Sequence, residues 1–186
     1  MRVSKFIGVL FTGAMAMAVS AQPARAETIV VYGASGNIGS VIVNEALSRG
    51  HHVVGVSRDP AKLKFDNKNF KSVAGDVTDL DSFKKVTKDA DAVIISVAGA
   101  GKDNEAQNTV HAQAARVAVQ AYTGVSKSPE IIQIGGALTL LDKKEDIDAK
   151  LPPPAKPGTP VYAMFMGHFD VLKTYCASKI RWSVLT

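Results

Sequence analysis

The segment Gly33-Ala-Ser-Gly36-Asn-Ile-Gly39 decides the fold. It follows the β-branched run Thr28–Tyr32 and opens a helical pattern over residues 37–49, which Gly50 ends. The first glycine permits a tight turn, the second lets the backbone approach a pyrophosphate, and the third lets the helix pack on the strand. The helix N-terminus then faces the phosphates. A strand, turn and helix in this order predict a dinucleotide-binding turn.

Strand-like and helical patterns keep alternating after this turn. The expected strands are apolar without alternation, which is typical of parallel strands buried on both faces. A proline-rich stretch at 151–160 should run as an extended surface loop. The fold class is therefore predicted to be α/β, with a doubly wound parallel sheet. The further strands expected are His52–Ser57, 70–77, 92–97, Glu130–Ile134 and 180–185, and the further helices are 81–88, 104–122 and 161–178.

The end of the second predicted strand bears on the choice of nucleotide. NAD sites usually place Asp or Glu there to hold the ribose hydroxyls, whereas NADP sites carry groups that accept a 2′-phosphate. Here Ser57 stands at the acid position, and Arg58 follows with paired N–H donors suited to phosphate. NADP(H) is therefore favoured over NAD(H). Asp59, in the turn at Pro60, keeps NAD(H) open.

Four motifs together resemble a known family: Gly33 to Gly39, Ser57-Arg-Asp-Pro60, Gly75-Asp-Val-Thr-Asp79 and Gly135-Gly-Ala137. They are similar to the atypical short-chain dehydrogenases/reductases. Within these, the chain most resembles the NAD(P)H-binding group of NmrA-like, NADH-flavin reductase-like and biliverdin reductase B-like proteins. The resemblance covers residues 28–186 and implies an NAD(P)-binding Rossmann fold. Relatives continue beyond the sixth strand, so a domain lacking its C-terminal end is expected.

The resemblance also implies a role for individual residues. The turn would line the pyrophosphate, two residues at the end of the second strand would hold the adenosine phosphate, and two at the end of the third would contact the adenine. Residues after the fourth strand would lie against the nicotinamide ribose, and the segment 135–139 would form the wall near the nicotinamide. In that order, the expected cofactor-binding residues are Gly33, Ser35, Gly36, Asn37, Ile38 and Gly39, then Ser57 and Arg58, Asp76 and Val77, Ala98 and Gly99, and Gly135.

Two residues are candidates for catalysis. Thr139 stands where these relatives often carry a serine, and His168 lies on a predicted helix from which relatives direct polar groups toward the substrate pocket. Tyr175 and Lys179 fit the Tyr-x-x-x-Lys signature of the larger superfamily, but the next strand follows them directly, so Tyr175 is expected to pack in the core. Lys179 is expected to be a helix-end cation.

The remaining histidines and acids give no further site. His51, His52 and His111 are expected to be structural or solvated. No His/Cys/Asp cluster has metal-ligand spacing, so no metal is expected. A single cysteine, Cys176, leaves the redox compartment undecided.

The N-terminal residues have the pattern of a secretory leader. Arg2 and Lys5 precede a charge-free run over residues 6–21, and Ala24-Arg-Ala26 offers small residues for cleavage. A run of this length is short for a membrane span, which needs about 20 residues. The expected organisation is a signal peptide at 1–26 and one domain at 27–186, with a periplasmic or secreted location. The alternative is a membrane anchor, if the leader is not cleaved.

Composition excludes other classes of partner. The chain of 186 residues has a formal charge of +5, but the leader holds three basic residues and no acidic one. The expected domain is therefore nearly balanced and has no basic patch for nucleic acid. A monomer or a weak dimer is expected.

Three functional hypotheses follow. The leading one is a reductase that passes hydride from NADPH to a flavin or another small planar acceptor, because such chemistry relies on the cofactor and on close approach. The second is a cofactor-binding or redox-sensing module without turnover. The third is an exported fold that has lost cofactor binding and acts by protein contact.

Overall fold

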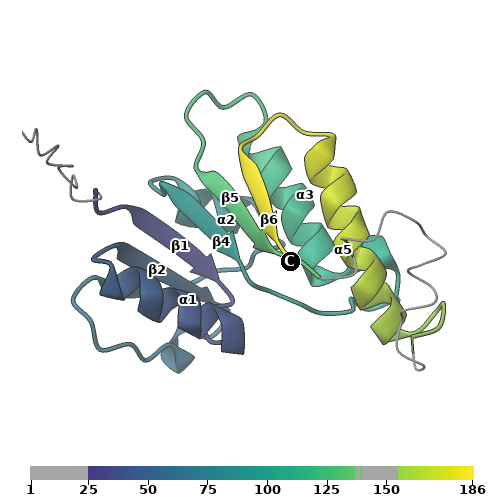
Figure 1. Cartoon of the computed structure of the whole chain (residues 1–186), viewed down its shortest axis with the longest axis horizontal. Coiled ribbons are helices and arrows are strands. Elements are labelled where there is room, and N and C mark those ends of the chain that lie inside the picture. Colours follow the sequence, from purple (N-terminus) through teal and green to yellow (C-terminus); the bar gives the residue numbers. More distant parts are fainter. Residues whose placement is uncertain (1–24, 137–138, 140–154) are drawn as a thin grey trace, which may run out of the picture.

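A six-stranded parallel sheet organises the protein, with helices on both of its faces (Figure 1). The computed structural model describes residues 25–136, 139 and 155–186. The predicted α/β class and doubly wound parallel sheet are confirmed. The strands are β1 (Thr28–Tyr32), β2 (His52–Ser57), β3 (Phe70–Ala74), β4 (Ala92–Ile95), β5 (Glu130–Ile134) and β6 (Trp182–Leu185). The helices are α1 (Asn37–Ser48), α2 (Leu80–Thr87), α3 (Val110–Tyr122) and α5 (Pro160–Cys176), with short 3-10 turns at Pro60–Lys62 and Ala106–Asn108.

The strand order β3-β2-β1-β4-β5-β6 places the crossing point beside β1. Val31 of β1 lies opposite Gly55 of β2 on one side and opposite Ile94 of β4 on the other. The chain winds outward from β1 in one direction and then, from β4 onward, in the other. In such sheets a crevice opens at the carboxyl ends of the strands where the winding reverses.

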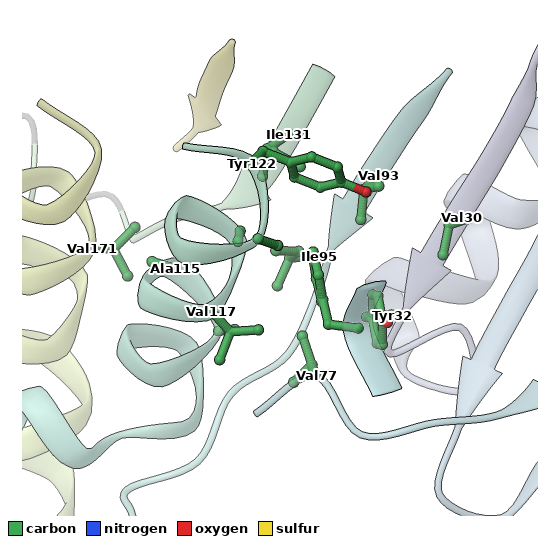
Figure 2. Close-up of a cluster of buried hydrophobic side chains, with 14 of the residues drawn as sticks. Val30, Tyr32, Val77, Val93, Ile95, Ala115, Val117, Tyr122, Ile131 and Val171 are labelled. Atoms are coloured by element: carbon green, nitrogen blue, oxygen red, sulfur yellow. The ribbon is translucent and has the colours of Figure 1, made fainter. Parts of the chain in front are cut away.

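Alternate residues of β1 pack in two separate hydrophobic clusters, one on each face of the sheet. Val30 and Tyr32 join the larger cluster with α2, α3 and α5, part of which Figure 2 shows. Ile29 and Val31 join a smaller cluster with α1, whose buried residues include Val43. Both faces of β1 are therefore buried, which explains why its sequence is apolar without alternation.

Several elements are shorter than their sequence patterns predicted. The third and fourth strands end at Ala74 and Ile95 rather than at 77 and 97, and the last begins at Trp182 rather than at 180. The helix predicted at 104–122 begins at Val110, because the Asp103 carboxylate accepts hydrogen bonds from Glu105 N–H and the Asn108 side chain. Local bonds of this kind compete with helix formation.

Residues 1–24 of the predicted leader lie outside the described residues, as do residues 151–154 of the predicted proline-rich loop. Within the described ranges, none of the helices combines the length and the apolar character needed to cross a bilayer.

Candidate functional site

A cleft of about 330 Å³ opens at the carboxyl ends of β1, β2, β3 and β4. Its walls come from the ends of β1 and β2 and from the segments that directly follow the four strands, with one residue from the start of α3. The shortened third and fourth strands therefore release their last predicted residues to line the cleft. The lining residues are Tyr32, Gly33, Ser35, Gly36, Val56, Ser57, Arg58, Gly75, Asp76, Val77, Thr78, Ser96, Val97, Ala98 and Val110.

The glycine turn has the geometry that its sequence predicted. Gly33 has φ +80°, and a Cβ on it would run into the backbone carbonyl of Ser96 on the neighbouring strand segment. A Cβ on Gly39 would run into the carbonyl of Gly33, so this glycine lets α1 pack closely on the turn. Gly36 N–H donates to the Gly33 carbonyl at 2.9 Å and closes the turn.

The N-terminus of α1 is left open at the cleft. Its N-cap is Gly36, which has no side chain to accept a backbone N–H, and the first helical turn contains no acidic residue. The first N–H groups of a helix have no partner within the helix and attract anions. This end of α1 can therefore bind a phosphate group that enters the cleft.

A serine and an arginine form the wall after β2. The Ser57 hydroxyl accepts a hydrogen bond from Asp59 N–H at 3.1 Å, and the exposed Arg58 lines the cleft. The carboxylate of Asp59 instead pairs with Lys62 at 3.4 Å and does not line the cleft. The wall therefore offers a cation rather than a carboxylate to a ligand.

Asp76 is an ionised, oriented carboxylate after β3. Its Oδ1 accepts hydrogen bonds from Thr78 N–H at 2.8 Å and from the Thr78 hydroxyl at 2.7 Å. The backbone hydrogen bond from Thr78, with help from the Thr78 hydroxyl and the nearby Arg58 guanidinium, holds the pKa of Asp76 below its ordinary value. The Asp76 N–H donates to Ser82 of α2 at 3.0 Å, which fixes this segment.

Tyr32 is a cleft residue that sequence reasoning missed. Its ring stacks on Phe83 at 5.3 Å, it is only 2% exposed, and its hydroxyl has no hydrogen-bond partner among the described residues. Burial raises the pKa of the hydroxyl. Tyr32 ends the first apolar strand, and its place directly before Gly33 is the sequence signal that could have identified it.

The structure gathers many of the predicted cofactor residues in the cleft and leaves others outside its lining. Gly39 packs inside the turn, Ile38 is exposed at the start of α1, and Asn37 precedes it. Gly99 packs against Val110, and Gly135 packs against Val184. The predicted residues within the lining are Gly33, Ser35, Gly36, Ser57, Arg58, Asp76, Val77 and Ala98.

The two catalytic candidates lie near each other but outside the cleft lining. The Thr139 hydroxyl donates to the Gly136 carbonyl at 2.7 Å. A Cβ on the same Gly136 would lie 2.7 Å from Cδ2 of His168, so the His168 ring is also at the carboxyl end of β5. His168 stacks on His111, which is fully buried rather than solvated.

Tyr175 lies in the core, as predicted. It is 0% exposed, its hydroxyl donates to Gln133 at 2.7 Å, and its ring stacks on Trp182. Burial raises its pKa. Lys179 is exposed and follows the end of α5. Neither residue of the Tyr-x-x-x-Lys pattern lines the cleft. The described part of the chain also contains no group of three His, Cys, Asp or Glu residues able to hold a metal ion.

Comparisons with known proteins bear on the family and the fold. Residues 33–130, just over half of the chain, match the protein family described as NAD(P)H-binding. The uncharacterised protein YLL056C of Saccharomyces cerevisiae is 41% identical over 69 residues, which are 36% of this chain and 23% of that protein.

Two solved structures extend the likeness over most of the chain. An inferred epimerase of Bacteroides thetaiotaomicron has a TM-score of 0.60 at 29% identity, covering 86% of this chain and 70% of that one. The enzyme WbmH of Bordetella bronchiseptica, solved with NAD+, has a TM-score of 0.60 at 23% identity, covering 87% and 57%. The chain thus spans less than two thirds of YLL056C and of WbmH.

Proposed function

Because the chain belongs to the NAD(P)H-binding family, we propose that it is a dinucleotide-dependent oxidoreductase that uses NADP(H) and reduces a small planar acceptor, such as a flavin. The observation that carries this proposal is the cleft at the strand crossing point, where an open helix N-terminus and an arginine face the same cavity. Both features suit a ligand with more than one phosphate.

The residues present fit such a cofactor. The unpartnered N-terminus of α1, with the amides of Asn37 and Ile38, would bind the pyrophosphate, which explains how residues outside the cleft lining can take part. Val77 would give the adenine an apolar contact, and the Asp76 carboxylate would accept a hydrogen bond from the exocyclic amine of the adenine. When bound, the nicotinamide supplies the hydride.

The wall after β2 supports NADP(H) over NAD(H). Arg58 can form paired hydrogen bonds to a 2′-phosphate, and Ser57 can donate its hydroxyl to it. An NAD site usually has a carboxylate at this place to hold the ribose hydroxyls. Asp59, the available acid, is paired with Lys62.

The acceptor would lie near the carboxyl end of β5. The small residue Ala98 lines the cleft on this side. A flat molecule stacked on the nicotinamide there would bring donor and acceptor to reacting distance. Of the two polar candidates at this end, the Thr139 hydroxyl is already bonded to Gly136. His168 is the stronger candidate for contact with the acceptor.

Binding tests the cofactor part of the proposal. Titration calorimetry with purified protein should show NADPH binding more tightly than NADH. Arg58→Ala should lower the affinity for NADPH about tenfold, as expected for loss of a charged hydrogen bond, and leave the affinity for NADH nearly unchanged. Arg49→Ala is the matched control, because Arg49 is also exposed but pairs with Glu45 on α1. Equal affinities for the two nucleotides would contradict the choice of NADP(H).

Turnover tests the reaction. NADPH and FMN are mixed with the protein, and the absorbance of the nicotinamide is followed over time. A rate above that of the protein-free mixture supports reduction of flavin-like acceptors. NADPH binding without turnover of any planar acceptor would instead select the second candidate, a cofactor-binding module without turnover.

Export to the periplasm or beyond is also part of the proposal. It is supported by the leader-like pattern over residues 1–26. The intact mass of the native protein tests it, because cleavage after Ala26 leaves a mature N-terminus at Glu27.

A further inference from the structure

Two histidines from different helices stack beside the carboxyl end of β5. His111 is the second residue of α3, and His168 lies in the middle of α5. Their ring centroids are 4.3 Å apart, with 22° between the planes. The proposed cofactor contacts use neither ring, so the pair needs its own explanation.

His111 is held rigidly from both its backbone and its ring. Its backbone carbonyl accepts a hydrogen bond from Gln133 of β5 at 2.9 Å, and Gln133 in turn accepts one from Tyr175. Its ring Nε2 lies 3.1 Å from the carbonyl of Met164, one helical turn before His168. A carbonyl only accepts, so Nε2 must carry the proton. His111 is therefore a fully buried, neutral ring of defined tautomer.

His168 is confined between that ring and the end of β5. On the side of Gly136, a Cβ would lie 2.7 Å from Cδ2 and 3.2 Å from Nε2 of His168. Its other nitrogen, Nδ1, is buried without a partner in the described residues. A buried N–H without an acceptor is costly, so the proton of neutral His168 belongs on Nε2. The donor of His168 is thus on the side of the strand end.

This strand end adjoins the cleft. Ile95 of β4 lies opposite Gln133 of β5, and the residues that follow Ile95 line the cleft. The His168 ring therefore packs at the end of β5, the strand next to β4, whose following residues line the cleft. The acceptor is expected on this side, next to the nicotinamide.

The surroundings keep both rings neutral near pH 7. Burial and the neighbouring His168 lower the pKa of His111 to about 4, and burial lowers the pKa of His168. Among the described residues, the groups near the pair are the Thr109 hydroxyl and Ala106 carbonyl before α3, the Met164 carbonyl of α5, and the backbone of Gly136. Arg116 and Asp170, on the same two helices, pair with each other at 2.9 Å.

We propose that His168 donates a hydrogen bond from Nε2 to a carbonyl oxygen or ring nitrogen of the acceptor, and that His111 is a positioning residue that holds the His168 ring by stacking. This inference rests on the proposed function. It narrows the acceptor to molecules that present a neutral hydrogen-bond acceptor beside the atom that receives the hydride. A neutral imidazole in this role polarises the acceptor without transferring a proton.

Two substitutions at His111 separate the stacking ring from its polar atoms. His111→Phe keeps a ring against His168, whereas His111→Ala removes it. NMR titration of the histidine Cε1 protons in the full chain should show the pKa of His168 staying low in the Phe variant and rising toward the ordinary value of about 6.5 in the Ala variant. With an acceptor that turns over, His111→Ala and His168→Ala should each lower kcat/KM for the acceptor roughly tenfold. The affinity for NADPH should not change, and combining the two should add little.

A histidine far from the stacked pair provides the control. His52→Ala removes an exposed histidine at the opposite end of the sheet and should leave all of these values unchanged. If the Ala variant does not fold, Gly136→Ala displaces the His168 ring from its other face and should lower kcat/KM for the acceptor in the same way. An unchanged His168 titration and unchanged acceptor kinetics in the variants would overturn the proposal, as would a parallel loss of NADPH affinity. Because the titration needs no turnover, it can fail or succeed independently of the oxidoreductase assignment.

Discussion

At the scale of single residues, three buried tyrosines differ in whether the hydroxyl group has a hydrogen-bond partner. The Tyr122 hydroxyl bonds to Thr87 and the Tyr175 hydroxyl to Gln133, whereas the Tyr32 hydroxyl has no partner among the described residues. A buried polar atom without a partner destabilises a fold, and a satisfied one stabilises it modestly. The same chemical deletion should therefore have opposite effects at these positions.

Tyr32→Phe should leave the free energy of unfolding unchanged or raise it by about 1 kcal/mol, since it removes a hydroxyl that only loses hydration on folding. Tyr175→Phe should lower the free energy by about 1 kcal/mol, because Gln133 then lacks its donor. Urea unfolding of both variants measures the difference. Equal destabilisation by the two would show that the Tyr32 hydroxyl does have a partner in solution.

Gly33 can be compared with Gly50, because both have positive φ but different surroundings. Gly50→Ala places its Cβ in open space and should cost about 1 kcal/mol for strain alone. Gly33→Ala adds a collision with the Ser96 carbonyl and should cost clearly more. Thermal unfolding of the pair separates the two effects; a Gly33 variant as stable as the Gly50 variant would mean that the turn can shift away from β4.

At the scale of elements, α1 lacks the capping side chain that most helices carry. Asp79 caps α2 by accepting from Ser82 N–H at 2.7 Å, but Gly36 caps α1 with none. Leaving these N–H groups without a side-chain partner weakens the helix and keeps its end available for an anion.

Gly36→Asp should lower the affinity for NADPH while adding a capping side chain to α1. The new carboxylate can cap α1, and its negative charge should repel the pyrophosphate and weaken NADPH about tenfold or more. The helix itself should lose little stability, since Gly36 has an ordinary φ of −79° and a Cβ there would lie 3.2 Å from the Gly33 carbonyl oxygen, which needs only a small shift. Calorimetry and thermal unfolding of the same preparation measure both effects. Unchanged NADPH affinity would show that the phosphates bind elsewhere.

Local pattern predicted most elements, and its errors have physical causes. The alternation of apolar strands and helices, together with the glycine turn, was enough for the fold and for the cleft walls after β1 and β2. It could not show that Asp103 and Asn108 bond locally and delay α3 to Val110. Nor could it bring His111 and His168, 57 positions apart in the sequence, into one stack, because that contact depends on how α3 and α5 cross the sheet.

At the scale of the whole molecule, the buried histidines tie stability to pH. The folded protein keeps His111 neutral down to a pKa of about 4, whereas in the unfolded chain a histidine takes up a proton near 6.5. The contribution of neutral His111 is therefore fully present above about pH 6.5 and is lost as pH falls through about 4.

Unfolding free energy should consequently fall between about pH 6.5 and 4, by an amount on the order of 3 kcal/mol for His111. His111→Phe has no such proton uptake and should flatten the profile in this range. Below it, the Asp76 carboxylate, whose pKa lies under its ordinary value, should add a further decline as it becomes protonated. Urea midpoints measured across this pH range test the profile; identical slopes for the two proteins would contradict it.

The crossing point beside β1 also has a kinetic consequence. Ile29 pairs with Val53 within a short loop but with Ala92 only after a loop of about sixty residues closes. Closing a longer loop costs more chain entropy, so the β1 and β4 pairing is expected late on the folding path. The cleft is complete only after this pairing forms, because residues that follow β1 and residues that follow β4 both line it. A nucleotide that binds there should therefore slow unfolding and leave the folding rate almost unchanged, so that it prolongs the lifetime of the native state more than it helps to reach it.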